Sequence, residues 1–414
     1  MRTRIINVWS KFRSSFWFVP TLFMLLAALG SFGLLRFDHT YGKAIVEAYP
    51  MFEMSPPAAR SILSSIVSAM VSTTGVVFSI TIVALSLASS QFGSRLIRTY
   101  RNRRTTHFTL GIFVSTSLFC ILVLASIREV NDFNFVPTAS VVVGMILTVI
   151  CLGTLVYYIH DMSTAIQAPN VIQHSADDLD KSIQRLFPED FGNEVPNDGQ
   201  IGADESFLKS AHETLGQPAM KVSCGEVGYL QAIEDETVMA YACDNNMTVR
   251  LLIRPGDFLF RERDLAEIWI HDDETISNFE GIEDVRKQAC EELNQSLIVG
   301  SERTHVQDIR YAFNELVDIA VRALSPGIND PFTAVNCVDR IHAALMLLKC
   351  RKSPSEYRLD DEGRIRVVAK PVSFDECVEG SLEVVAFYAN ENPMVSTRID
   401  LAIESIERLH ETVR

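Results

Sequence analysis

Four long apolar stretches lie within the first 160 residues, and they decide what kind of protein this chain can form. They cover residues 16–35, 62–88, 108–127 and 136–159. Each reaches the roughly 20 residues that a helix needs to cross the ~30 Å hydrocarbon layer of a bilayer. The first stretch is too long for the apolar core of a signal peptide, and no clean cleavage site follows it. The sequence therefore predicts four retained transmembrane helices.

Charge divides the chain at the same place. Residues 1–160 carry a net charge of +8 while the whole chain carries −15, which leaves −23 for residues 161–414. Basic residues beside apolar spans are attracted to anionic lipid headgroups, whereas the acidic remainder lacks the basic face that nucleic-acid binding requires. We therefore expect a lipid bilayer, and no nucleic acid, among the partners. The eight cysteines form no CxxC pair and are expected to be reduced thiols.

Basic residues in the short flanks predict the orientation. Four lie before the first stretch and five between the second and third, whereas the segments 36–61 and 128–135 have few. Because Lys and Arg are retained on the cytoplasmic side of a membrane, both termini are expected to be cytoplasmic. Residues 1–16 also place their apolar side chains on one helical face, which predicts an interfacial amphipathic helix on the inner leaflet.

The second stretch contains a line of small residues. They repeat in alternating steps of three and four and therefore fall on one side of a helix. We call them the serine stripe: Ser65, Ser68, Ser72, Gly75, Ser79, Ile82, Ser86 and Ser89, with Gly93 continuing the spacing. Small residues let two helices pack closely in lipid. The same stripe could instead line a water-filled pore, in which Ile82 would be an apolar constriction that gates by dewetting. The sequence leaves both interpretations open, and they merge if the helix packs around an oligomer axis.

Two arginines, Arg95 and Arg98, follow the stripe at its cytoplasmic end. At the mouth of a pore they would favour anions, although membrane topology alone also accounts for them. No Asp, Glu or Lys lies inside the four stretches. This absence argues against a proton-coupled or ion-coupled transporter, because such proteins usually need ionisable groups within the membrane.

The remainder is expected to form a mixed α+β cytoplasmic domain. After residues 1–160, with their interfacial helix and four-helix transmembrane domain, residues 161–218 indicate a helical connector with a linker. Residues 219–258 are rich in strand formers, including Val238 and Met239, between turns at Asp244-Asn-Asn and Pro255-Gly-Asp, which predicts a small β-barrel-like module. Residues 259–414 are mainly helical, with a strand near 364–368.

Capping signals and apolar stripes support the helices of residues 259–414. Apolar stripes at 306–323 and 395–413 are typical of a core or an oligomer interface. Three helix starts are predicted from capping residues, which are Thr304 with Gln307, Asp330 with Pro331, and Ser373 with Glu376.

No catalytic motif stands out. Nucleotide-binding loops, the catalytic-serine elbow, the HExxH helix and the EF-hand loop are all missing from the sequence. The acidic run from His271 to Glu274 contains a possible metal ligand, but a solvated loop accounts for it. We therefore predict no enzyme activity, no metal site and no cofactor.

Two long strings resemble a known family. They are Glu302-Arg-Thr-His-Val-Gln-Asp-Ile309, continued by Leu316-Val-Asp-Ile-Ala-Val-Arg-Ala-Leu-Ser-Pro-Gly-Ile-Asn-Asp-Pro-Phe-Thr-Ala334, and Phe78-Ser-Ile-Thr-Ile-Val-Ala-Leu-Ser86. The chain is similar over nearly its whole length to a bacterial family of predicted membrane proteins, domain of unknown function 2254. The resemblance implies a bacterial inner-membrane protein and carries over no catalytic residues.

Together these features favour a homo-oligomeric, pore-forming or channel-like protein with a cytoplasmic assembly domain. The alternative is a membrane-anchored sensor or scaffold whose cytoplasmic domain binds an unidentified partner. Oligomeric state separates the two, because one serine-rich helix cannot enclose a channel by itself.

Overall fold

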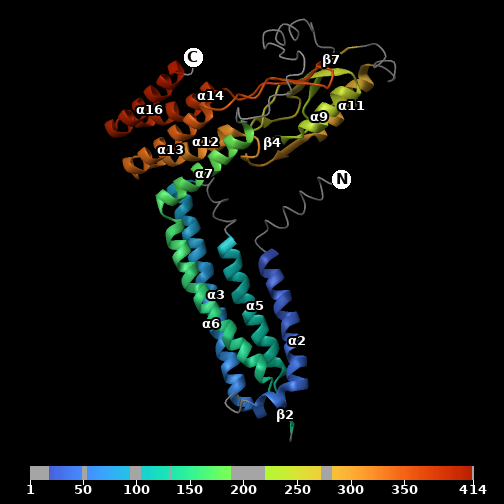
Figure 1. Ribbon diagram of the computed structural model, residues 1–414, viewed down its shortest axis with the longest axis vertical. Coiled ribbons are helices and arrows are strands. Elements are labelled where there is room, and N and C mark those ends of the chain that lie inside the picture. The colour runs from blue at the N-terminus through green and yellow to red at the C-terminus, as the bar shows by residue number, and fades with distance from the viewer. Residues whose placement is uncertain are drawn as a thin grey trace. The chain divides into compact units, whose positions relative to one another are not determined.

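The computed structural model describes residues 18–48, 54–93, 104–130, 133–187, 220–271 and 282–412 (Figure 1). The chain divides into two compact units, Met1–Val171 and Ile172–Arg414, which we call the membrane unit and the C-terminal unit. The predicted interfacial helix over residues 1–16, the linker near 188–202, and both Arg95 and Arg98 lie outside the described residues.

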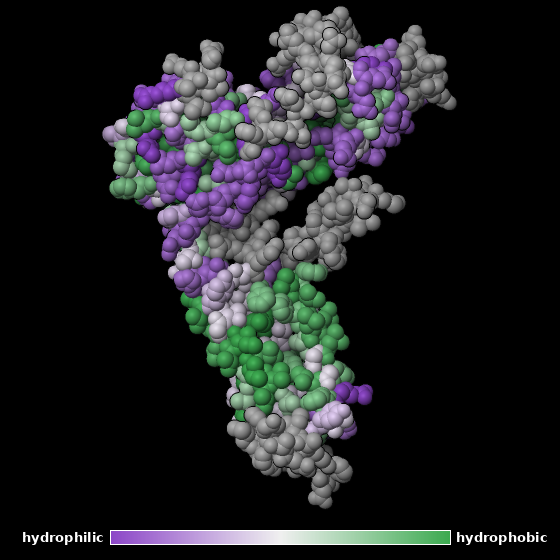
Figure 2. Space-filling model, viewed as in Figure 1, coloured by the Kyte–Doolittle hydropathy of each residue, from purple (hydrophilic) through white to green (hydrophobic). Residues whose placement is uncertain are grey.

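Four long helices build the described part of the membrane unit. They are α2 (Phe18–Ala48), α3 (Pro56–Phe92), α5 (Arg104–Ser126) and α6 (Thr138–Ala165). Each contains an apolar span of 22 to 36 residues, which is long enough to cross a bilayer. The prediction of four membrane-spanning helices is confirmed. Figure 2 shows the corresponding surface, which is largely apolar on this unit.

Helix α5 is the centre of the membrane unit, where it contacts α2, α3 and α6. Its Phe113 packs with Met70 of α3 and Cys151 of α6. A short antiparallel hairpin of β1 (Arg128–Val130) and β2 (Phe133–Phe135) connects α5 to α6. More than half of the α5 span is buried inside the unit, compared with less than a quarter of each other span. The other three helices therefore present most of their apolar surface outward.

A buried carboxylate fixes the start of α6. Helix α2 continues beyond its apolar stretch and carries Asp38, which the sequence had placed in an outer loop, to a position only 3 % exposed. Its two carboxylate oxygens accept hydrogen bonds from the backbone N–H groups of Ala139 and Ser140, both at 3.0 Å, and from the Ser140 hydroxyl at 2.5 Å. Pro137 precedes α6 and supplies no cap of its own, so a negative charge from another helix satisfies the positive helix end.

Helix α7 (Ala168–Leu186) spans the boundary between the two units in the sequence. Two sheets and two helices after it form one half of the C-terminal unit. The five-stranded sheet has the order β3-β7-β5-β10-β9, and the three-stranded sheet the order β6-β4-β8. Helices α9 (Asp235–Asp244) and α11 (Ile282–Gln295) contribute to the apolar core beside them. The strands are β3 (Met220–Ser223), β4 (Gly228–Ile233), β5 (Met247–Leu251), β6 (Phe258–Leu259), β7 (Asp264–Ile270), β8 (Leu297–Gly300), β9 (Tyr357–Leu359) and β10 (Ile365–Ala369).

The predicted barrel-like module at residues 219–258 is not confirmed. No closed barrel forms among the described residues, and β3, β4 and β5 complete their hydrogen bonding with β7, β8 and β10, which all lie beyond residue 258. Val238 and Met239 belong to helix α9 rather than to a strand. Short apolar runs do not distinguish a buried helix from a strand, and pairing between distant strands leaves no local signal.

Helices make up the other half of the C-terminal unit. They are α12 (Ile309–Ala323), α13 (Pro331–Lys349), α14 (Phe374–Val378), the π-helical turn η3 (Glu379–Glu383), α15 (Val384–Ala389) and α16 (Pro393–Thr412). Helix α13 packs against both α12 and α16. Val395, Ile399 and Ala402 of the predicted last stripe are buried in this packing. These three residues of the stripe therefore belong to the core of the helical half.

The predicted helix starts meet different outcomes. Asp330 caps α13 by accepting a hydrogen bond from the Thr333 N–H at 3.1 Å, and the Ser373 hydroxyl caps α14 in the same way. The predicted start at Thr304 is wrong. Helix α12 begins at Ile309 and is capped by Asp308, while the Gln307 amide binds both backbone groups of Ile233 instead.

Candidate functional site

The serine stripe occupies the side of α3 that faces away from the rest of the membrane unit. Met70 and Val77 are buried against α5 and α6. Ser72 and Ser79 each lie two residues further along, which is about 200° around a helix of 3.6 residues per turn. The sequence spacing is thus realised as one continuous face, directed outward from the membrane unit.

Exposure shows that this face has no cover within the described chain. Seven members of the stripe, from Ser65 to Ser86, are exposed, and Ser89 is partly buried. Ile82 is 52 % exposed. A methyl group added at Gly75 would meet no atom within 4 Å. The small size of these residues is therefore not required by packing against the described helices of the same chain.

Hydroxyl groups on the two sides of α3 behave differently. On the inward side, Thr74 donates to the Met70 carbonyl at 2.7 Å, and Thr81 contacts the Tyr158 hydroxyl at 2.5 Å. The side-chain hydroxyls of the six serines in the stripe make no hydrogen bond to any part of the chain that the structure describes. A hydroxyl left in hydrocarbon without a partner is unfavourable. The stripe therefore lacks the partners that the inward hydroxyls have.

The outward faces of the neighbouring helices provide a contrast. Leu29 of α2 is 71 % exposed and Val156 of α6 is 70 % exposed, and both are suited to lipid chains. On α3, apolar side chains such as Val76 and Phe78 are exposed beside the stripe. Only the strip between them is polar and narrow. Such a surface can pack against another helix or border water, and both require further helices.

The remaining sequence candidate is the acidic run that begins at His271. His271 contacts the Thr248 hydroxyl at 2.8 Å, and the rest of its acidic run lies outside the described residues. Within the described ranges, no group of three or more His, Cys, Asp or Glu side chains is placed to hold a metal ion.

Sequence reasoning missed two sets of charged residues. One is Asp38, and the other is a network of arginines and carboxylates around Asp308 in the C-terminal unit. The run Arg254-Pro-Gly-Asp257 indicates a tight turn with charged residues at both ends, which is part of the second set. No local sequence pattern indicated that Asp308 and Arg310 would lie beside this turn.

Comparison with known proteins assigns the chain to a family. Uncharacterized proteins of Mycobacterium tuberculosis and Mycobacterium bovis are each 28 % identical to it over 386 residues, which is 92 % of this chain and 70 % of theirs. No solved structure matches the chain significantly. The family model described as "Predicted membrane protein (DUF2254)" matches residues 13–405. Because this match covers almost the entire sequence, the chain belongs to that family of predicted membrane proteins.

Proposed function

We propose that this protein is a homo-oligomer of the bacterial inner membrane in which copies of α3 surround a common axis and form a channel-like pathway. The observation that carries the proposal is the outward position of the serine stripe, on the side of α3 opposite to its buried residues. A second copy would cover the stripe, and several copies would enclose it.

The physical argument starts from the lipid. Apolar side chains gain little by leaving hydrocarbon, so helices associate in membranes through close packing and hydrogen bonds. A face of serines and glycine supplies both, whereas it supplies nothing to a lipid chain. Around an axis, the same hydroxyls would border water. Ile82 would then form the only bulky apolar ring of the stripe, and apolar rings close pores by dewetting.

The proposed orientation follows from charge. Basic residues before α2 and between α3 and α5 would place both of those segments, and hence both termini, in the cytoplasm. The acidic C-terminal unit would then be a cytoplasmic assembly domain. Large apolar side chains exposed on its helices, such as Phe332 at 76 % and Phe387 at 71 %, are suited to contacts between copies.

Single-cysteine labelling tests the proposal. A water-soluble thiol reagent should modify cysteines placed at Ser72 and Ser79 in protein lacking its native cysteines. It should not modify one placed at Val149, an exposed apolar position on α6 that the proposal leaves in contact with lipid. Light scattering of the purified protein should give an oligomer mass. A monomer would remove the proposal.

Ion flux separates a pore from a packing interface. In proteoliposomes, Ile82→Ser should raise flux because a polar side chain wets the constriction, while Ile82→Leu should leave it unchanged. If the protein is an oligomer, but Ile82→Ser does not raise ion flux and the stripe cysteines are not labelled, the sensor or scaffold alternative is favoured.

A further inference from the structure

A small pocket of about 150 Å³ lies in the C-terminal unit between α12 and the segment formed by α14 and η3. Its closed side consists of Phe313 and Cys377, which are 1 % and 2 % exposed. Burial, followed by the nearby Glu376 carboxylate, raises the pKa of the Cys377 thiol to about 12, so that side is neutral. The polar lining comes from Arg303, Arg310, Asn314 and Glu376.

Hydrogen bonds to carboxylates and a carbonyl hold the two arginines in place. The Arg303 Nε donates to Asp308 Oδ2 at 2.8 Å, and Asp308 is 1 % exposed. The Arg310 Nη2 donates to the Pro255 carbonyl at 3.1 Å and to Asp257 Oδ1 at 3.3 Å. Both guanidinium groups are therefore positioned before any ligand arrives.

A glycine makes this arrangement possible. Gly256 adopts a φ of +94°, and a Cβ there would lie 2.1 Å from Asp308 Oδ2 and 3.0 Å from Arg303 Nη2. Any other residue would be strained at this φ and would push the carboxylate away. The turn is therefore shaped around the charged groups.

The network keeps an unbalanced positive charge in an acidic part of the chain. Arg254 donates to both Glu376 oxygens, at 3.0 and 3.1 Å, and Arg263 pairs with Asp257 at 3.1 Å. Four side chains of the network are positive and three are negative, and they are Arg254, Arg263, Arg303 and Arg310 against Asp257, Asp308 and Glu376. Because Arg254 neutralises Glu376, that carboxylate does not cancel the charge on the pocket-lining arginines.

Two hydrogen-bond donors of the lining have no acceptor. The Arg310 Nε is buried without a hydrogen-bond partner among the described residues, and the nearest carboxylate oxygen of Asp308 is 3.8 Å away. The partly buried Asn314 amide likewise has no partner within the part of the chain that the structure describes. The π-helical turn η3 forms the opposite wall, and such turns occur frequently at functional sites.

We propose that this pocket binds a small oxyanion, a phosphate or carboxylate group, that accepts hydrogen bonds from Asn314 and from the arginines of the lining. Charge-assisted bonds of this kind are the stronger class of hydrogen bond. A water occupies ~30 Å³ of liquid, so the pocket has room for a group of several heavy atoms. The proposal is independent of the channel-like function, and it would give the C-terminal unit a ligand of its own.

Thermal unfolding of the full-length protein in detergent tests the site. Sodium phosphate and sodium acetate are compared with sodium chloride at matched ionic strength. A bound ligand stabilises the folded protein by mass action, so one of the two oxyanions should raise the unfolding temperature in a saturable way that chloride does not reproduce. Stabilisation by phosphate would identify a phosphate site, and stabilisation by acetate a carboxylate site.

Two variants and a control make the test specific. Asn314→Asp keeps the shape of the side chain but sets a carboxylate against the anion, and should weaken binding about ten-fold or more. Gly380→Leu should have the same effect by filling the pocket edge, where an added Cβ meets nothing within 4 Å. Asn336→Asp on α13 makes the same charge change outside the pocket lining and should leave binding intact. Equal anion responses in Asn314→Asp and Asn336→Asp, or no oxyanion-specific response in the unmodified protein, would overturn the proposal.

Discussion

The membrane unit and the C-terminal unit place their polar groups in opposite ways. In the membrane unit, apolar side chains such as Leu29 cover the outside. Asp38 is the one buried carboxylate among the described residues of that unit. The C-terminal unit has a largely polar outside (Figure 2) and buries charges in pairs. Arg366 is 1 % exposed and donates to Asp360 at 2.8 Å. The polarity of each unit's surface therefore matches its expected surroundings, which are lipid for the membrane unit and water for the C-terminal unit.

The contrast shows which residues need a special explanation. Exposed serines are ordinary on a protein in water, where water molecules accept and donate hydrogen bonds to them. On a membrane helix that faces lipid, these water molecules are missing. Buried arginines are costly anywhere unless they are paired. The serine stripe on α3 is an exception to the first rule. The pocket beside α12 departs from simple pairing because its network has four arginines and three carboxylates. Both proposals rest on these exceptions.

The largest expected effect comes from breaking a buried pair in the C-terminal unit. Asp360→Ala removes the carboxylate that accepts from Arg366 at 2.8 Å and from Arg364 at 2.9 Å. The Arg366 guanidinium would remain buried without its counter-charge, which costs about 3–5 kcal/mol of unfolding free energy. Denaturant unfolding followed by circular dichroism measures the loss.

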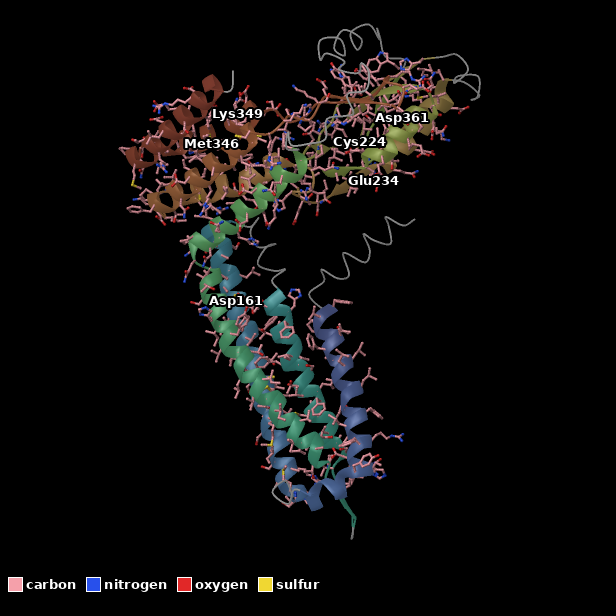
Figure 3. All side chains as sticks on the ribbon, viewed as in Figure 1. Asp161, Cys224, Glu234, Met346, Lys349 and Asp361 are labelled. Carbon is pink, nitrogen blue, oxygen red and sulfur yellow. The ribbon has the colours of Figure 1, made fainter. Side chains whose placement is uncertain are left out.

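Asp361 is the matched control for that substitution. It is the next residue along the chain and is exposed (Figure 3). Asp361→Ala should change the unfolding free energy by less than about 0.5 kcal/mol, as is usual for surface positions. Equal losses in the two variants would show that the buried pair has no special weight.

The same pair predicts sensitivity to acid. Burial alone would raise the pKa of Asp360, but hydrogen bonds from the Arg364 backbone and from the Arg366 and Arg364 side chains lower it well below its ordinary range. The folded pKa is thus lower than the unfolded value of about 3.9. The pair stabilises the fold fully above that value, and this contribution is lost as the pH falls from there through the lower folded pKa. Asp360→Ala should lack this acid transition.

A smaller loss is expected in the membrane unit. Asp38→Ala deprives the N-terminus of α6 of three hydrogen bonds and leaves buried N–H groups unsatisfied. The expected cost is about 1–3 kcal/mol, less than for the buried pair because no charge is left without a partner. Thermal unfolding in detergent measures it.

Asp38→Asn provides the intermediate case. It keeps one acceptor oxygen and should retain part of the stabilisation. If Asp38→Ala proves as costly as Asp360→Ala, the two units do not differ in how strongly they depend on single buried charges.

The sequence predicted those parts of the fold that have a local cause. Four spans followed from length and apolarity, and the start of α13 followed from Asp330 and Pro331. Each of these signals lies within one turn or one stretch of chain. The outward side of the serine stripe did not follow, because spacing defines a face without saying what covers it.

Long-range contacts account for most of what the sequence did not predict. The parallel pairing of β5 with β10 joins residues more than a hundred positions apart. Gln307 had the right spacing for a capping box, but it binds the backbone of Ile233 in another element. The pocket beside α12 likewise gathers side chains from two distant segments, residues 303–314 and 376–380. In each case the local sequence showed one residue of the contact, but the residue that it contacts lies in a distant part of the chain.

The smallest effect concerns titration near neutral pH in the C-terminal unit. His342 lies on α13, and its Nε2 is buried without a hydrogen-bond partner among the described residues. Burial lowers the pKa of His342, and Arg398 of α16 lowers it further, while Asp339 opposes the shift. The protonated form is therefore less favourable in the folded protein than in the unfolded chain, whose histidine has a pKa of about 6.5.

Stability should accordingly fall as the pH drops through that value, because the unfolded state then binds the extra proton. His342→Gln removes the titrating group and should flatten the decline between pH 7.5 and 5.5, while Arg398 and Asp339 keep their ion pair. Thermal unfolding of both proteins across this range measures the difference. Parallel curves would mean that the imidazole is hydrated in the fold. The acid response expected through Asp360 would be unaffected by that outcome.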